Sequence, residues 1–191
     1  MNQNCMHVSQ GSLDEGNHVV FLQPFGIGSP GGGSRILRAL LQDAPVPWTS
    51  VVSSPQAPHP APFGKELHIA SRPSFGRLER SRFHSWCQGF EPLFAGLFRR
   101  RLQAACQARD VAAIHSIPHS LDFVSGWQIA KRLGLRYFLS VHDDLAFTLA
   151  NHPHRTKALE NFALIWRNAD ARFVISEHLG REYCLRFGQV K

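Results

Sequence analysis

The chain has 191 residues and a formal net charge of +7, and 43% of its residues are hydrophobic against 18% charged. This length and composition exclude an intrinsically disordered chain and allow one domain with a core of its own, while the basic excess favours an anionic partner. No apolar run is long enough to span a membrane, and the polar residues 1–17 are not a secretory signal, so we expect a cytoplasmic protein with a flexible tail over residues 1–17.

The first half of the chain alternates short apolar runs with glycine-rich and proline-rich loops. Residues 55–64 hold four prolines and predict an irregular loop. Ser34 precedes a stretch in which Ile36, Leu37, Leu40 and Leu41 share one helical face, which predicts a helix with Ser34 as its N-cap. The elements predicted here are strands at residues 18–23, 48–53 and 67–71 and a helix at residues 34–42.

The second half begins with a helical pattern over residues 76–109, which we expect Pro92 to kink or split. Apolar residues recur there at steps of three and four and predict a face packed on the sheet. These residues are Phe83, Trp86, Phe90, Leu93, Phe94, Leu97, Phe98 and Leu102. The elements predicted beyond are strands at residues 111–115, 135–142 and 171–176 and helices at residues 121–133, 155–168 and 177–187.

Strands that alternate with helices predict an α/β fold. We expect residues 18–188 to form a Rossmann-like three-layer α/β/α domain, with a mainly parallel sheet of about six or seven strands. Ligands bind such sheets outside the carboxyl ends of the strands. The candidate binding residues are therefore those that end or follow a predicted strand, namely Gly31, Gly32, Gly33, Ser34, His115, His142, Asp143, Asp144, Ser176 and Glu177.

The glycine-rich loop after the first strand spells G-x-G-x-x-G at Gly26, Gly28 and Gly31. A dinucleotide site also needs an acidic residue at the end of the next strand, and this strand offers none, so a nicotinamide-dependent oxidoreductase is disfavoured. A P-loop needs Gly-Lys-Ser/Thr, and Gly-Ser-Arg stands there instead. We interpret Gly26 and Gly28 as a flexible lead-in. We expect the backbone of residues 31–34 to come close to a ligand and to bind an anion or hydroxyl groups there. The alternative is a tight turn that binds no ligand.

Three segments resemble glycosyltransferase family 4. They are Pro-Gly-Gly-Gly-Ser-Arg at residues 30–35, Val-His-Asp-Asp-Leu at residues 141–145, and a closing stretch at residues 168–188 that contains Phe-Val-Ile-Ser-Glu. The resemblance implies the GT-B fold, in which two Rossmann-like domains face each other across a cleft. It implies that this chain is the N-terminal, acceptor-side domain of an enzyme that transfers a sugar from a nucleotide-sugar donor with retention, without a metal or other cofactor.

The resemblance also implies a C-terminal domain that binds the donor nucleotide. This sequence ends at Lys191, where the linker to that domain would stand. We therefore expect half of an enzyme, inactive alone, which needs the missing C-terminal domain or a partner subunit that supplies it.

Each candidate residue also has a structural alternative. His142 is the expected catalytic residue, donating to a sugar hydroxyl or stabilising charge on the transferred sugar, although it could instead bond a backbone carbonyl. Asp143 and Asp144 could accept hydrogen bonds from acceptor hydroxyls, or one of them could cap the turn. Ser176 could contact a ligand or cap the last helix.

Six arginines crowd the predicted long helix, at positions 77, 80, 82, 99, 100 and 101. A solvated helix face is the favoured interpretation. The alternative function is a non-catalytic α/β binding module whose basic helix contacts an anionic ligand or an anionic membrane surface, as a peripheral protein at the inner face of the membrane. No zinc-finger or RNA-binding signature is present, so nucleic acid is not an expected partner, and neither the cysteines nor the histidines have the spacing of a metal site.

Overall fold

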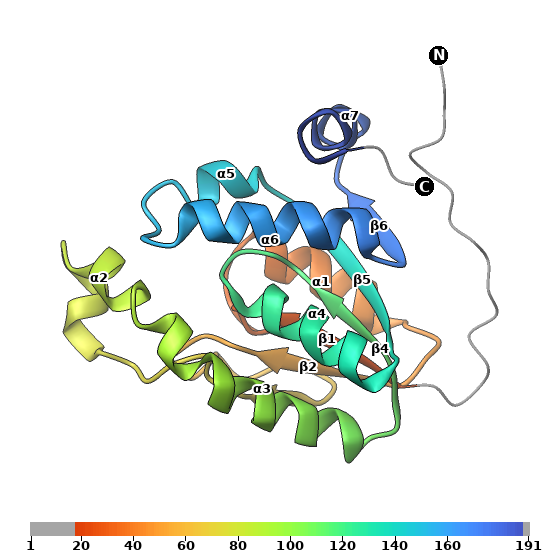
Figure 1. Cartoon of the computed structure of the whole chain (residues 1–191). Coiled ribbons are helices and arrows are strands. Elements are labelled where there is room, and N and C mark those ends of the chain that lie inside the picture. Colours follow the sequence, from red (N-terminus) through yellow and green to blue (C-terminus); the bar gives the residue numbers. More distant parts are fainter. Residues whose placement is uncertain (1–17, 189–191) are drawn as a thin grey trace.

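Six short apolar runs form one parallel sheet in the computed structural model, which describes residues 18–188. The sheet order is β3-β2-β1-β4-β5-β6, so the α/β, Rossmann-like prediction is confirmed, with six strands (Figure 1). The predicted tail at residues 1–17 lies outside the described residues. The strands are β1 (His18–Gln23), β2 (Trp48–Val52), β3 (Glu66–His68), β4 (Val111–Ser116), β5 (Arg136–Val141) and β6 (Ala171–Val174).

The first strand of the chain, β1, lies at the centre of the sheet, and later strands are added on both sides of it. β1 pairs with β2 on one side and with β4 on the other, and all pairings are parallel. Right-handed crossovers that run in opposite directions from this point place helices on both faces of the sheet. The carboxyl ends of β1 and β4 therefore form the switch point at which ligands bind sheets of this type.

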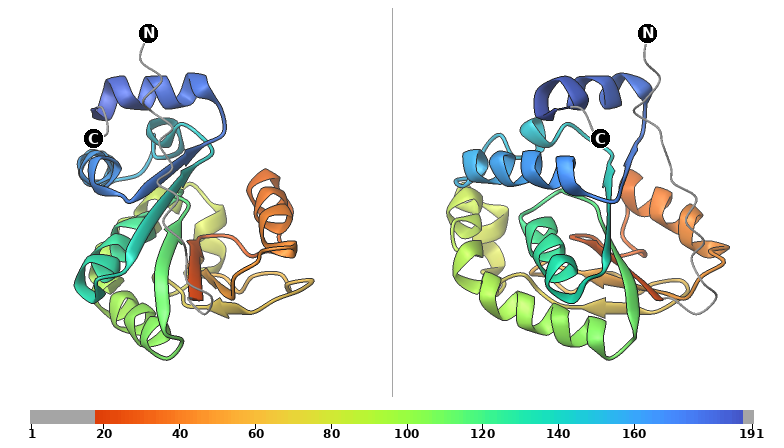
Figure 2. Two further views of the ribbon diagram at one scale, coloured as in Figure 1. Left: turned by 90° about the vertical axis from the view of Figure 1, so that its right-hand side faces the viewer. Right: turned by 45° about the vertical axis from the view of Figure 1, so that its right-hand side comes forward.

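The two faces of the sheet carry different helices (Figure 2). Val20, Leu22 and Tyr137 belong to the large core that also takes in side chains of α3, α4 and α6, and we call this the closed face. Phe21 points the other way, toward a smaller core with Leu37 and Leu41 of α1, and we call this the open face. The helices are α1 (Gly32–Gln42), α3 (Glu91–Gln107), α4 (Asp122–Leu133), α6 (Arg155–Asn168) and α7 (Glu177–Phe187).

Helix α1 departs from its prediction in two ways. It begins at Gly32, so Gly31 is the N-cap and the prediction that Ser34 caps the helix is wrong. Ser34 stands in the first turn and is buried. Of the four apolar residues expected to face inward, Leu37 and Leu41 are buried, whereas Ile36 and Leu40 are 40% and 56% exposed.

The predicted helix over residues 76–109 is divided into three. A 3-10 helix, η2 (Gly76–Arg80), and a short helix, α2 (His84–Gln88), precede α3 (Glu91–Gln107). Pro92 lies in the first turn of α3, where its missing N–H costs no helical hydrogen bond, so it marks a helix start and produces no kink. A further short helix, α5 (Leu145–Thr148), was not predicted.

Half of the apolar face predicted for this segment does not pack on the sheet. Phe98 and Leu102 are buried as expected. The prediction is wrong for four others, because Phe83, Trp86, Leu93 and Leu97 are 45%, 57%, 75% and 49% exposed. Within residues 18–188, no helix is long and apolar enough to cross a membrane.

Candidate functional site

The candidate site lies at the carboxyl edge of the sheet, around the switch point. The loop after β1 leads into α1, the loop after β4 leads into α4, and residues 142–144 follow β5. Because neighbouring parallel strands end at the same edge, these three connections converge there. The side chains they bring together are Phe25, His119, His142 and Asp143.

The start of α1 presents backbone to this site. Gly31 has φ 134°, a value that L side chains rarely adopt, and no side chain caps the helix among the described residues. A Cβ on Gly33 would stand 2.8 Å from Cζ of Phe25, so a larger residue there would displace the end of the Phe25 ring. Gly32 has no positive φ, and a Cβ there would contact no atom within 4 Å, so neither its backbone nor its surroundings require glycine. The first turn of α1 thus carries uncapped N–H groups, which favour an anion or a hydroxyl oxygen.

The two glycines before this turn are packed and not a flexible lead-in, so that interpretation is wrong. A Cβ on Gly28 would stand 2.0 Å from the carbonyl oxygen of Pro60, and a Cβ on Gly26 would stand 2.6 Å from Cβ of Pro58. The backbone N–H of Ile27, between them, donates to Oε2 of Glu66 at 2.7 Å. The proline-rich loop therefore holds the β1–α1 loop in place.

His119 is the residue that the predicted site set missed. It lies in the loop after β4, which ends at Ser116, at the switch point. Its ring packs edge-on against Phe25 with centroids 5.6 Å apart, and its Nε2 lies 3.9 Å from Oδ2 of Asp143. Burial lowers the pKa of His119, while Asp143 raises it. Its place after a central strand is the signal that could have selected it.

His142 lies beside His119 and is half-buried. Burial lowers its pKa, His119 lowers it further, and Asp143 opposes them, so the imidazole is neutral at pH 7. Its buried Nδ1 has no hydrogen-bond partner among residues 18–188. The structural alternative, a histidine bonded to a nearby backbone carbonyl, is therefore not observed for Nδ1 in the described part of the chain. Asp143 is exposed, with 65% of its side chain accessible, and its carboxylate is open to a ligand.

Two of the predicted residues, Asp144 and Ser176, have structural tasks, and a third, Glu177, lies away from the site. Asp144 caps α5, accepting from the N–H of Ala146 at 2.9 Å, and pairs with Arg186 at 3.1 Å. Ser176 caps α7 by accepting from the N–H of Leu179 at 3.2 Å. Glu177 is exposed and follows β6, the edge strand, so β4 and β5 separate it from the β1 loop. The structure does not bring Ser176 and Glu177 together with the glycines of α1.

His115 lies within β4 on the open face. Its ring contacts those of Phe21 and Phe173, with centroids 4.9 and 5.5 Å away, and its Nε2 lies 2.6 Å from the hydroxyl of Ser140. Burial lowers its pKa to about 4, with a smaller contribution from His142. His115 is therefore neutral at pH 7, and its Nε2 is already engaged.

The end of β2 and the placing of potential metal ligands bear on two other kinds of site, over the described residues 18–188. No acidic residue stands at the end of β2, and the hydroxyl of Ser53 there donates to Asp122 at 2.5 Å. Within residues 18–188, no group of three or more potential ligands is placed to hold a metal ion.

Comparisons with known proteins give a weak likeness. No protein-family model matches the chain, and no curated protein matches it. One similar solved structure is that of Phytolacca americana UGT2 complexed with UDP-2fluoro-glucose and pterostilbene, 17% identical, with a TM-score of 0.45, covering 81% of this chain and 36% of that one. Apo UGT2 from the same plant is 15% identical, with a TM-score of 0.41, covering 78% of this chain and 35% of that one. The chain thus spans about a third of the length of these structures, and such a likeness assigns no family.

Proposed function

We propose that this chain is the acceptor-side domain of a glycosyltransferase, which transfers a sugar from a nucleotide-sugar donor to an acceptor with retention. The observation that carries the proposal is the cluster of His119, His142 and Asp143 opposite the uncapped start of α1, at the switch point of the sheet. The three sequence segments that resemble glycosyltransferase family 4 support it. The donor nucleotide would be bound by a second domain outside this sequence.

The neutral imidazole of His142 suits the handling of sugar hydroxyls. With its pKa lowered by burial, it donates from one ring nitrogen and accepts at the other at pH 7. Its Nδ1 is buried, so a substrate hydroxyl, or charge that develops on the transferred sugar, would contact the half-buried ring through Nε2. A preorganised donor of this kind contributes about 10²–10³-fold in rate when it is aimed at developing charge.

Asp143 and His119 suit the acceptor. The exposed carboxylate of Asp143 would accept hydrogen bonds from acceptor hydroxyls, and the His119 ring, with its Nε2 3.9 Å from that carboxylate, would border the same acceptor. Phe25 offers an apolar ring face beside them. The N–H groups at the start of α1 would then face an anionic group, such as a phosphate that crosses from the donor side.

The test joins the chain to a donor-binding domain. A fusion with the donor domain of a glycosyltransferase of family 4 is assayed for release of nucleotide and for sugar transfer to a panel of hydroxylated acceptors. We expect transfer by the fusion, no turnover by the isolated chain, and a loss of about 10²-fold in kcat for His142→Ala in the fusion. Arg181→Ala, on the exposed side of α7, is the matched control and should leave the rate unchanged.

The outcomes separate the proposal from its alternative. A folded fusion without transfer to any acceptor, whatever the nucleotide sugar, would favour the non-catalytic binding module. A product with inverted anomeric configuration, read by NMR, would retain glycosyl transfer and reject retention.

A further inference from the structure

The segment of η2, α2 and α3 exposes an unusual combination of side chains. Five of its large apolar residues are 42–75% exposed, and exposed arginines precede and follow them along the chain. We call this combination the arginine–apolar surface, and it comprises Leu78, Phe83, Trp86, Leu93, Leu97, Arg77, Arg80, Arg82, Arg100 and Arg101. Figures 1 and 2 draw this segment at the periphery of the molecule, outside the sheet.

The apolar and basic residues of α3 share one stripe of the helix. Leu93, Leu97 and Arg101 follow one another at steps of four, and Arg100 lies beside them. The buried residues Phe98 and Leu102 are offset from this stripe and face the core. Leu93 and Arg100 therefore face away from the core, whereas Leu97 and Arg101 lie at the edge of the stripe, beside the segment that follows β3.

The arginines of this surface are not neutralised by carboxylates. The acidic residues of the segment are Glu79 and Glu91, and both are taken up by Arg72, at 2.5 and 3.9 Å. Among the described residues, none of the five exposed arginines forms a salt bridge. A surface of unpaired arginines beside exposed aromatic and aliphatic side chains is complementary to anionic headgroups above an acyl layer.

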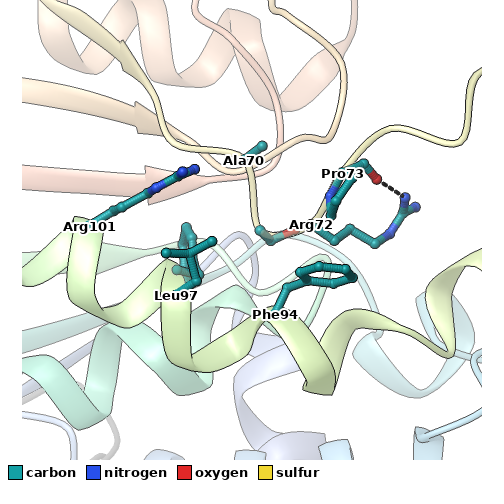
Figure 3. A pocket seen from close by; sticks show the side chains of 8 residues that line it. Ala70, Arg72, Pro73, Phe94, Leu97 and Arg101 are labelled. Carbon is teal, nitrogen blue, oxygen red and sulfur yellow. Dashed lines mark hydrogen bonds between the residues drawn. The ribbon is translucent and has the colours of Figure 1, made fainter.

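A small pocket continues this surface at the end of β3 (Figure 3). Phe94 and Leu97 form an apolar wall, Arg101 extends along one side, and the guanidinium of Arg72 turns away toward the carbonyl of Pro73 at 3.1 Å. The pocket has a volume of about 190 Å³. Sites for soluble ligands enclose about 300–1,000 Å³, so this pocket fits only part of a molecule, such as the headgroup end of a lipid.

We propose that the arginine–apolar surface docks on an anionic lipid bilayer. Trp86, Leu93 and Leu97 enter the interface, and the exposed arginines contact the headgroups. A second copy of this chain is a poorer occupant, because each copy carries a net charge of +7. Residues 1–17 contain no lysine or arginine and so add no electrostatic attraction of their own. The inference does not depend on glycosyl transfer.

The test is flotation of the full chain with vesicles. Vesicles of equal parts phosphatidylcholine and phosphatidylglycerol should carry the chain to the top of the gradient, whereas pure phosphatidylcholine should not, and added salt should release it. Neutralising Arg100 and Arg101 (R100Q/R101Q) should weaken binding about 25-fold, since each arginine near a surface contributes about fivefold. The matched control is K131Q/R132Q, which removes the same charge from exposed residues of α4.

A second readout follows the apolar contact. Tryptophan emission should shift to shorter wavelength when anionic vesicles are added, and Trp86→Phe should abolish this shift, because the other tryptophans are half-buried or buried. Circular dichroism checks that every variant is folded. The proposal is overturned if anionic vesicles do not bind, if neutral vesicles bind equally, or if R100Q/R101Q binds as the control does. Dimerisation through Trp86 and Leu93 without vesicle binding would also overturn it, in favour of a protein partner.

Discussion

The two faces of the sheet are closed to different degrees. On the closed face, under α3, α4 and α6, Phe123 and Phe162 have no exposed surface. On the open face, α1 and the proline-rich loop cover only the half with β1–β3, and Phe173 and Ile175 of the other half are 43% and 60% exposed. Alternating strands and helices thus specify a parallel sheet without specifying equal cover on both of its faces.

The imbalance follows from the crossovers. β2 and β3 are joined by the proline-rich loop and not by a helix, so the open face receives α1 alone from the first half of the chain. The crossover from β3 to β4 carries α3, which packs beside α4 on the closed face. Right-handed crossovers then add α4 and α6 to the same face.

We expect the largest loss of unfolding free energy from a cavity in the core under the closed face. Phe162 contacts the rings of Phe123, Trp166, Tyr183 and Phe187, so Phe162→Ala should cost about 3–5 kcal/mol of unfolding free energy through the cavity it leaves. Urea denaturation measures this loss. Phe162→Leu, which keeps more of the volume, should lose clearly less. A cost under about 1 kcal/mol for the alanine variant would show that this face is loosely packed.

The closed face also contains a buried carboxyl group, that of Asp122, whose protonation makes the stability of the fold depend on pH. Burial raises the pKa of Asp122, at the start of α4, to about 6, against hydrogen bonds from Ser53 and Ser120 that lower it. The folded protein therefore binds an extra proton between pH 4 and 6, so this group stabilises the fold at low pH and the stabilisation is lost as pH rises through 6. The full difference is about 3 kcal/mol.

Asp122→Asn should remove that pH dependence. The wild type should gain about 3 kcal/mol relative to the variant as the pH falls from 7 to 4. Urea midpoints over this pH range measure the difference. A constant difference between the two proteins would show that Asp122 keeps an ordinary pKa.

His115, on the open face, makes the stability of the fold depend on pH in the opposite direction to Asp122. Burial among Phe21, Phe138 and Phe173 lowers the pKa of His115 to about 4. The unfolded chain then binds the extra proton, so this group's stabilisation is present above pH 6.5 and is lost as the pH falls toward 4. The effect is on the order of 2 kcal/mol, reduced from the full value because the ring is only half-buried.

His115→Gln keeps a hydrogen-bonding group near Ser140 and removes the titration. Relative to the variant, the wild type should lose stability between pH 6.5 and 4, against the gain that Asp122 gives over the same range. Thermal unfolding at several pH values separates the two, and NMR of the His115 ring protons reports its pKa directly. Titration of the ring near 6.5 would contradict the expected burial.

The same contrast explains what the sequence could predict. All six strands and the helix at residues 155–168 follow from apolar runs and spacing, and Phe162 and Trp166 are buried as their periodicity indicates. Periodicity also predicted a buried stripe through Trp86 and Leu93, but it does not say whether another element exists to cover it. His119 was missed because its neighbours, Phe25 and Asp143, are distant in sequence and meet only when β1, β4 and β5 align.

The smallest expected effect lies at the exposed end of the open face. Phe173→Ala on β6 should change the unfolding free energy by no more than about 0.5 kcal/mol, because its ring is already 43% exposed and leaves no closed cavity. Urea denaturation at two protein concentrations, tenfold apart, measures the change. A loss near that of Phe162→Ala that grows with concentration would mean that a second molecule covers this face in solution. An equal and small loss at both concentrations would establish that the sheet is stable with one half of one face uncovered, since the closed face alone then supplies the packing that holds β4, β5 and β6 together.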